Sequence, residues 1–253
     1  MHERLLFGRI QAVRPLPPGP LVGHYNFESL RLARPQGVTL QGWCALPKRV
    51  SVSPGRVIIY FPGRNEHAAW APDMASHVGD AAYYAFNFRG GGGSTGVPSE
   101  VAAKADAMAI HELIRQRHGG SLDRLVLIGR SLGTAIALWL AHQVRPRELV
   151  LLSPFDSIRA LLKDRPFGRV AGLLLGQTFD CASTASEVDA RTLVLLADRD
   201  REVPNERSLR LCTHLPRAPR IRILHGVTHQ TLPRCAQAQR AMAEFLTGPA
   251  GPR

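Results

Sequence analysis

Short, uninterrupted apolar runs recur along the chain and restrict its fold more than any other feature of the sequence. A strand that is apolar at nearly every position is buried on both faces, as strands are in a parallel sheet covered by helices. Runs of this kind follow one another at Arg56–Phe61, Ala81–Phe88, Arg124–Gly129, Glu148–Ser153, Thr192–Ala197 and Arg220–His225. We therefore expect these runs to form the middle of one sheet.

Segments with helical character separate most of these runs, at Val101–Arg117, Ser131–Val144, Glu206–His214 and Arg234–Leu246. The repeated order of strand and helix predicts an α/β fold with a mostly parallel central sheet and helices on both faces. A chain of 253 residues suits one domain of this kind, so residues 1–253 are predicted to form a single domain.

The N-terminal part has a different pattern. Phe27–Ala33 and Val38–Leu46 alternate apolar and polar residues, as half-buried strands do. The segment between them, Arg34–Gly37, contains the turn residues Pro35 and Gly37, so an antiparallel hairpin is predicted before the parallel strands. Residues 1–25 include a proline-rich piece and are expected to run over the surface.

One interval, residues 154–190, does not follow the alternation of strand and helix. It contains one apolar stretch, Val170–Gly176, and no clear strand. An insertion at this place lies above the carboxyl ends of the strands, where open α/β sheets bind their ligands. We predict a short lid here, with an ordinary long crossover helix as the alternative.

A Gly-x-Ser-x-Gly sequence is typical of a nucleophile elbow, in which a serine sits on the sharp turn between a buried strand and a helix. The pattern occurs around Ser94 and again around Ser131. Ser131 follows the apolar run Arg124–Gly129 and precedes a helical segment, whereas Ser94 lies in a glycine run followed by Val97 and Pro98. Ser131 is therefore the predicted nucleophile, and Ser94 is predicted to be a loop residue.

The geometry of an elbow explains the residues on either side of Ser131. The turn is so sharp that Ser131 is expected to adopt a strained backbone conformation. Gly129 and Gly133 stand where the neighbouring strand and helix approach too closely for side chains. The helix that follows points its free N–H groups at the site, and the N–H of Leu132 is a predicted oxyanion donor.

A serine hydroxyl needs a nearby base, and enzymes with this elbow carry serine, acid and histidine in that order along the chain. Of the histidines that follow Ser131, His142 lies too far along the helix and His214 lies near a helix end before the last strand. His229 lies in a loop after the last apolar run, which can reach over the sheet to the serine. We predict His229 as the base, with His225 as the alternative.

The acid is expected after the preceding apolar run, where Asp198 and Asp200 both stand. Asp200 lies further beyond the end of the strand, where its side chain can turn toward the histidine. It would hold His229 in the tautomer that accepts the serine proton and would stabilise the imidazolium that results. Asp198 is expected to cap a backbone group or to pair with an arginine.

A second oxyanion donor is expected from the loop after the first parallel strand, Phe61–Glu66. Gly63 lets the backbone of this loop approach a substrate, and the N–H of Arg64 is the predicted donor. A plain turn at Pro62 and Gly63 is the alternative interpretation.

Together these pieces resemble the α/β-hydrolase superfamily, and in particular its single-domain bacterial members related to the serine aminopeptidases and to the fungal bud-emergence hydrolases. The resemblance covers roughly residues 25–245. Its matching pieces are GVTLQGW (Gly37–Trp43), IIYFPGRNE (Ile58–Glu66), FNFRGGGGSTGVPSE (Phe86–Glu100), IGRSLGTAIA (Ile128–Ala137), SPFDSI (Ser153–Ile158), DREVP (Asp200–Pro204) and HGVTH (His225–His229).

The resemblance implies the same nucleophile, acid and base, namely Ser131, Asp200 and His229, and a structural loop at Arg89–Gly96. One departure concerns the oxyanion loop, because the family usually has His-Gly where this chain has Pro62 and Gly63. Proline lacks an N–H, but the predicted donor stands two residues later, so function can survive. Family members often carry an N-terminal membrane anchor, and none is expected in this chain.

Charge and cysteine usage argue against other function classes. The net charge is +12, but the basic residues are mostly arginines spread along the chain without a block of like charges, so nucleic-acid binding is not expected. The spacing of the four cysteines fits neither a disulfide framework nor a zinc site, and reduced thiols and no metal are expected. With no signal peptide and no apolar run long enough to span a membrane, a cytoplasmic enzyme is expected.

The expected function is therefore serine hydrolysis of a small-molecule ester, thioester or amide through an acyl-enzyme, most simply by a carboxylesterase-like activity. This chemistry requires no cofactor. The same fold could instead support a peptidase, a thioesterase or an acyltransferase, or a binding protein without catalytic activity.

Overall fold

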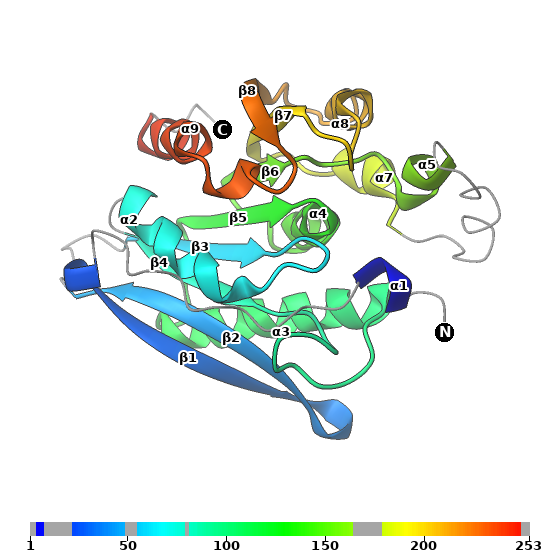
Figure 1. Cartoon of the computed structure of the whole chain (residues 1–253). Helices are drawn as coiled ribbons and strands as arrows, with labels where there is room; N and C mark the ends of the chain where they lie inside the picture. Colours follow the sequence, from blue (N-terminus) through cyan, green and yellow to red (C-terminus); the bar gives the residue numbers. More distant parts are fainter. Residues whose placement is uncertain (1–3, 8–21, 49–54, 79–80, 164–178, 249–253) are drawn as a thin grey trace.

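The apolar runs of the sequence form most of an eight-stranded sheet in a computed structural model of the chain (Figure 1). The structure describes residues 4–7, 22–48, 55–78, 81–163 and 179–248. The strands after the N-terminal hairpin are β3 (Arg56–Phe61), β4 (Ala81–Phe86), β5 (Leu125–Arg130), β6 (Glu148–Leu152), β7 (Arg191–Arg199) and β8 (Arg220–Thr228). All of their mutual pairings are parallel, and every residue of β4, β5 and β6 is buried.

The predicted hairpin is confirmed as β1 (Tyr25–Arg34) and β2 (Val38–Pro47), which pair in antiparallel register. A 3-10 turn, η2 (Pro35–Gly37), joins them. Gly37 has φ +68°, a left-handed conformation that glycine adopts at little cost. Strand β2 also pairs antiparallel with β4, which attaches the hairpin to the parallel strands.

The strand order is β1-β2-β4-β3-β5-β6-β7-β8. From β3 the chain crosses to one side to form β4 and then returns to the other side to form β5. The loops that follow β3 and β5 therefore leave the sheet next to each other, at a point where the strand order reverses. Crevices at such points are where open α/β sheets bind ligands.

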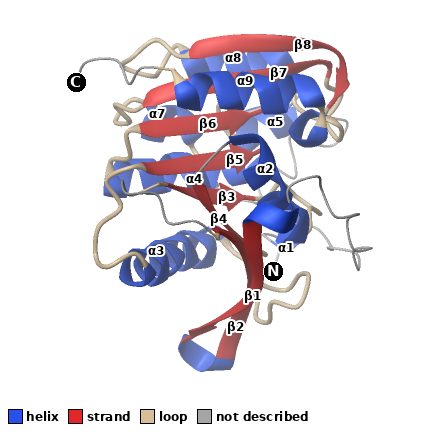
Figure 2. Cartoon of the chain, turned by 90° about the vertical axis from the view of Figure 1, so that its left-hand side faces the viewer, coloured by secondary structure: helices blue, strands red, loops and turns tan. Residues whose placement is uncertain are grey.

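Helices cover both faces of the sheet, as predicted (Figure 2). One core lies between the sheet and helices α3 (Glu100–Arg117), α4 (Leu132–Val144), α7 (Cys181–Ala185) and α8 (Asn205–Cys212). The other lies between the sheet and η3 (Ala68–Met74), α2 (Ala75–Val78) and α9 (Ala236–Thr247). The predicted fold, a mostly parallel α/β-hydrolase sheet with an N-terminal antiparallel hairpin, is thereby confirmed.

Several short elements have no counterpart in the sequence prediction, because a helix of one or two turns shows no readable periodicity. They include η3, α2 and α7 together with α1 (Arg4–Phe7), η1 (Val22–His24), α5 (Ile158–Lys163) and η4 (Leu232–Arg234). In α1 the Phe7 side chain is buried, with its ring centroid 5.2 Å from that of Phe88 and 6.2 Å from that of Phe179. Most of the segment 1–25, which was expected at the surface, lies outside the described residues.

The interval predicted as a lid is described in part. It begins with α5 and ends with α7, and an antiparallel bridge joins Ser157 to Asp180. Residues 164–178, which include the apolar stretch Val170–Gly176, lie outside the described residues. The lid therefore stays a prediction.

Helix α4 packs extremely close to strand β3 at its first turn. A Cβ atom added at Gly133 would lie only 2.1 Å from the carbonyl oxygen of Phe61 and 2.6 Å from that of Pro62. Backbone atoms cannot give way as a flexible side chain can. Glycine at this position therefore sets the distance between the helix and the strand.

We expect Gly133→Ala to lower the free energy of unfolding by roughly 3 kcal/mol, because α4 must move away from β3. Gly23→Ala is the matched control, since a Cβ there would meet nothing within 4 Å. Urea unfolding followed by circular dichroism measures both variants. Equal stabilities for the two would contradict the close packing of α4 on β3.

Candidate active site

The turn from β5 into α4 holds Ser131 in an unusual backbone conformation. Its φ is 49° and its ψ is −118°, in a region that residues other than glycine seldom adopt. The Ser131 N–H donates to the Leu152 carbonyl at 2.9 Å, and the Ser131 carbonyl accepts from the Thr134 N–H at 2.9 Å and its hydroxyl at 2.6 Å. Such strain costs ~1–3 kcal/mol and persists where surrounding contacts determine the conformation.

Glycine also flanks the turn on the strand side. A Cβ at Gly129 would lie 2.5 Å from the carbonyl oxygen of Gly133 and 2.6 Å from the Cα of Thr134. The two glycines that the sequence analysis singled out thus stand where strand, helix and neighbouring loop leave no space for a side chain. A serine on this turn projects from the carboxyl end of the sheet.

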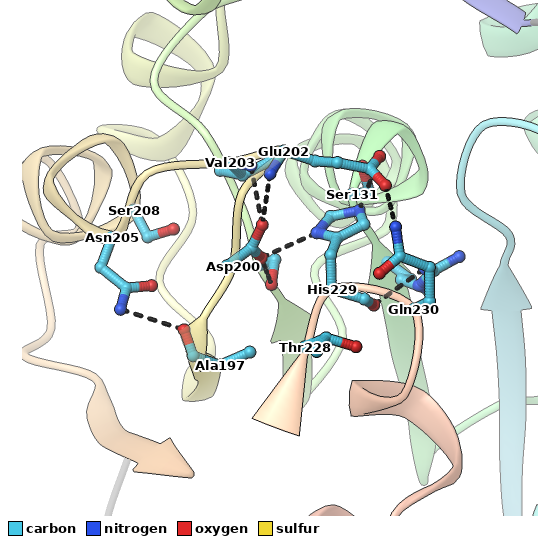
Figure 3. Close-up of polar contacts among 12 residues, drawn as sticks. Ser131, Ala197, Asp200, Glu202, Val203, Asn205, Ser208, Thr228, His229 and Gln230 are labelled. Atoms are coloured by element: carbon cyan, nitrogen blue, oxygen red, sulfur yellow. Dashed lines mark hydrogen bonds and ion pairs between the residues drawn. The ribbon is translucent and has the colours of Figure 1, made fainter. Parts of the chain in front are cut away.

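Asp200 and His229 meet at the ends of β7 and β8 (Figure 3). The imidazole Nδ1 of His229 is 2.7 Å from Asp200 Oδ2, and the two side chains are only 4% and 1% exposed. The second carboxylate oxygen, Oδ1, accepts the backbone N–H groups of Glu202 at 2.9 Å and Val203 at 2.8 Å. The Ser153 hydroxyl donates to Oδ2 at 2.7 Å. Asp200 is therefore held on all sides while it binds the histidine.

These contacts decide the charge of Asp200. Burial alone would raise the pKa of its carboxyl group, because a charge is poorly solvated inside a protein. Hydrogen bonds from His229, the Val203 N–H and Ser153, together with the positive charge that His229 can carry, outweigh burial and lower the pKa. The carboxylate is therefore ionised and able to orient an imidazole.

A second aspartate and histidine lie close together but differ in environment. His225 Nδ1 is 3.5 Å from Asp198 Oδ2, and the His225 side chain is 88% exposed. Asp198 accepts the N–H groups of Gly226 at 3.0 Å and Val227 at 3.1 Å, and these bonds lower the pKa of its carboxyl group. Asp198 thus caps backbone groups of β8, which is the first of its two expected roles, and no hydrogen bond to an arginine accompanies these among the described residues.

The histidine loop is attached to the elbow. The Arg130 guanidinium, one residue before Ser131, donates from Nη2 to the His229 carbonyl at 2.9 Å. In the view of Figure 3, Ser131 lies on the side of the imidazole that faces away from Asp200. The half-exposed Glu202 carboxylate is 3.7 Å from His229 Nε2 and also accepts the Gln230 side-chain amide.

The loop after β3 presents backbone N–H groups near this turn. The Gly63 N–H donates to Glu66 Oε2 at 2.5 Å, and the Asn65 N–H donates to the Phe7 carbonyl at 3.4 Å. Within the described part of the chain, the N–H of Arg64 has no protein acceptor, and neither has the N–H of Leu132 at the start of α4. Pro62 lacks an N–H, so the N–H groups of this loop begin with Gly63.

The structure also places residues that the sequence analysis did not assign to the site. Ser153 follows β6 with φ 47° and binds Asp200, and Glu66 and Arg130 form an ion pair under the two loops. The position of Ser153 directly after a buried strand was a readable signal, whereas its contact with Asp200 depends on strand order. Ser94 lies in a loop, where its hydroxyl donates to the Asn87 carbonyl and accepts the Gln41 N–H.

The family described as serine aminopeptidase, S33, matches residues 52–179, just over half of the chain. The chain belongs to the serine aminopeptidase S33 family. The predicted membership of the α/β-hydrolase superfamily is thereby confirmed, and the matched segment contains Ser131 but ends before Asp200 and His229.

Relatives of this S33-family chain match part of its length. An uncharacterized protein of Mycobacterium tuberculosis is 34% identical over 145 residues, which are 57% of this chain and 51% of the relative. The Danio rerio protein described as lysophosphatidylserine lipase ABHD12 is 34% identical over 137 residues, which are 47% of this chain and 35% of that protein. The chain thus spans about half or less of the length of these relatives.

Solved structures share the fold at lower identity. The acetyl xylan esterase from Paenibacillus sp. R4 superimposes with a TM-score of 0.70 at 19% identity, covering 95% of this chain and 88% of that one. The Pyrococcus furiosus esterase Pf2001 gives a TM-score of 0.70 at 16% identity, covering 96% and 100%. These likenesses show the fold of the S33-family chain.

Two further observations concern the described residues of the S33-family chain. Among them, no helix has the length and apolar character to cross a membrane. Nor do three or more His, Cys, Asp or Glu side chains gather there as a metal site would require.

The pKa of Asp200 leads to a prediction about stability. Because the folded-state pKa lies below the ordinary value of about 3.9, the ionised carboxylate stabilises the fold above that pH, and this contribution is lost as the pH falls through the folded-state pKa. The free-energy difference between wild type and Asp200→Asn should therefore be largest near neutral pH and shrink below about pH 4. Urea unfolding at a series of pH values measures it.

A His229→Gln background supplies the control for this experiment. The hydrogen bond from His229 is the largest contribution that lowers the pKa of Asp200, so the same comparison should depend less on pH in that background. A wild-type difference that stays constant from pH 7 to pH 3 would contradict the lowered pKa.

Proposed function

We propose that this chain is a serine hydrolase with esterase activity, in which Ser131 is the nucleophile, His229 the base and Asp200 the acid. The observation that carries the proposal is the buried pair of His229 and Asp200, joined at 2.7 Å, beside a strained serine turn. A buried carboxylate that binds the Nδ1–H group favours the tautomer in which the lone pair of the other ring nitrogen, Nε2, can accept a proton.

In the proposed reaction, His229 Nε2 takes the hydroxyl proton of Ser131 as the oxygen attacks an ester carbonyl. The imidazolium that forms is stabilised by the Asp200 carboxylate, which stays ionised. His229 then gives the proton to the departing alcohol. Water, activated by the same histidine, attacks the acyl-enzyme and releases the acid and the free serine.

The tetrahedral intermediate carries a negative oxygen that needs donors in place before the reaction. The N–H groups of Leu132 and Arg64 have no protein acceptor within the described residues and extend from the two loops that leave the sheet next to each other. We assign them as the oxyanion hole. Donors of this kind contribute about 10²–10³-fold each to the rate.

An ester is the proposed substrate class, and an alcohol its leaving group. The Danio rerio relative, 34% identical over 137 residues, is described as a lysophosphatidylserine lipase, and lipases act on esters. The fold is also that of the esterases to which the chain is similar. The family name, serine aminopeptidase, makes an amide with a free amino group the second candidate.

Labelling with a fluorophosphonate tests the nucleophile directly. We expect wild-type protein to be labelled on Ser131, and Ser131→Ala to lose both labelling and hydrolysis of p-nitrophenyl esters by at least ~10³-fold. Ser94→Ala is the matched control, because it removes the serine of the other Gly-x-Ser-x-Gly sequence and should keep both. Labelling of Ser131→Ala at the wild-type rate would overturn the proposal.

A substrate panel separates the bond classes. Faster hydrolysis of p-nitrophenyl esters than of aminoacyl-nitroanilides supports the esterase proposal, and the reverse order assigns the chain as a peptidase. Absence of both activities and of labelling would instead favour a binding protein on the same fold.

A further inference from the structure

A buried ion pair lies beside the candidate site and takes no part in the proposed chemistry. Arg130 Nη1 is 3.1 Å from Glu66 Oε2, and the two side chains are only 9% and 7% exposed. Burying two charges is unfavourable unless hydrogen bonds and a close partner replace the lost hydration. The other contacts of the pair therefore indicate its role.

The Glu66 carboxylate is surrounded by donors. Oε1 accepts the Tyr60 hydroxyl at 2.8 Å and the Trp70 indole N–H at 3.0 Å, and Oε2 accepts the Gly63 N–H at 2.5 Å as well as Arg130. The bond to Gly63 fixes a peptide group in the loop after β3. That peptide directly precedes the proposed oxyanion donor.

Arg130 extends the network to the other two parts of the site. It is the residue before Ser131, so its backbone belongs to the elbow. Its Nη2 donates to the carbonyl of His229 at 2.9 Å, while Nη1 binds Glu66. One guanidinium group thus joins the oxyanion loop, the elbow and the main chain of the proposed base.

The close packing at this place requires an arginine at position 130 and a glycine at position 63. A Cβ at Gly63 would lie 3.0 Å from Arg130 Nη1 and 3.2 Å from Glu66 Oε2, so the loop closes tightly over the pair. Burial alone would lower the pKa of Arg130, but the charge of Glu66 raises it, and the guanidinium stays protonated. A lysine would keep the charge but lack the planar fork that reaches two acceptors at once.

We infer that Arg130 and Glu66 are positioning residues, whose ion pair fixes the oxyanion loop, the elbow and the His229 loop relative to one another. The inference rests on the proposed function for its effect on catalysis, while its geometric content stands separately. Neither side chain touches a reacting atom, so each acts through the backbone groups that it holds.

The test uses Glu66→Gln and Arg130→Lys in the full chain. Glutamine keeps the shape of Glu66, but its NH₂ group cannot accept from Gly63 or Arg130. We expect kcat for p-nitrophenyl esters to fall about 100-fold in each of the two variants. The reason is that the loops which Glu66 and Arg130 hold would shift, and a displacement of ~1 Å in a catalytic group lowers the rate by about this factor. KM should stay within about threefold of wild type, because ground-state binding is not removed.

Glu148→Gln is the matched control. Glu148 is also a buried carboxylate, 9% exposed and paired with Arg56 and Arg191, but it lies at the start of β6, away from the carboxyl ends of the strands. It should lower the melting temperature without changing kcat. If the single variants at the site fail to fold, Glu66→Gln combined with Arg130→Met removes both charges together, and it should fold while kcat stays low.

A nuclear magnetic resonance measurement separates this inference from the proposed function. Relative to Glu148→Gln, the site variants should shift the amide signal of Arg64 and the Nδ1 proton signal of His229. Shifted signals in a protein without esterase activity would sink the proposed function and keep the positioning role. Wild-type kcat in Glu66→Gln, or unmoved Arg64 and His229 signals in the site variants, would overturn the inference.

Discussion

The close approach of helix α4 to strand β3 is the constraint on which the candidate site depends. Gly129 and Gly133 allow the backbone to turn so sharply that Ser131 adopts φ 49°, with the helix N-terminus directly behind it. The same approach brings the loop after β3 against the first turn of α4. Within the described residues, each of these two segments carries an N–H without a protein acceptor at the carboxyl end of the sheet, as the proposed oxyanion hole requires.

Hydrogen bonds stabilise the buried negative charge of Asp200 at the carboxyl ends of the strands. Asp200 would be poorly solvated at 1% exposure, yet contacts with His229, Ser153 and two backbone N–H groups lower the pKa of its carboxyl group. The exposed pair of Asp198 and His225, which precede Asp200 and His229 by two and four residues, shows what burial adds. There the carboxylate caps the end of β8, and the imidazole is left in water.

The parts that the sequence predicted are those with a local signal. The continuous apolar runs and the alternating hairpin were readable without coordinates. The motif around Ser131 and the positions of Asp200 and His229 after the last two strands were also readable, and the roles of these three residues stay a proposal. Short elements such as η3 and α2 were not readable, because tertiary packing rather than periodicity forms them. Contacts such as Ser153 with Asp200, or Arg130 with the His229 carbonyl, join strands whose adjacency depends on topology, so no sequence window contains them.

Buried carboxylates that each bind two arginines account for part of the arginine-rich composition. Asp106 binds Arg89 through two parallel hydrogen bonds of 2.7 and 2.8 Å and Arg34 at 2.9 Å, and Glu148 is shared by Arg56 and Arg191. Arginine suits this use because its planar fork meets two acceptors in fixed geometry. Near Ser131, at the carboxyl ends of the strands, the same kind of arginine–carboxylate interaction has a different effect. There the guanidinium group of Arg130 binds the Glu66 carboxylate and the His229 carbonyl, which belong to two separate loops. An interaction that elsewhere joins elements of the scaffold therefore joins the segments that carry the proposed catalytic groups.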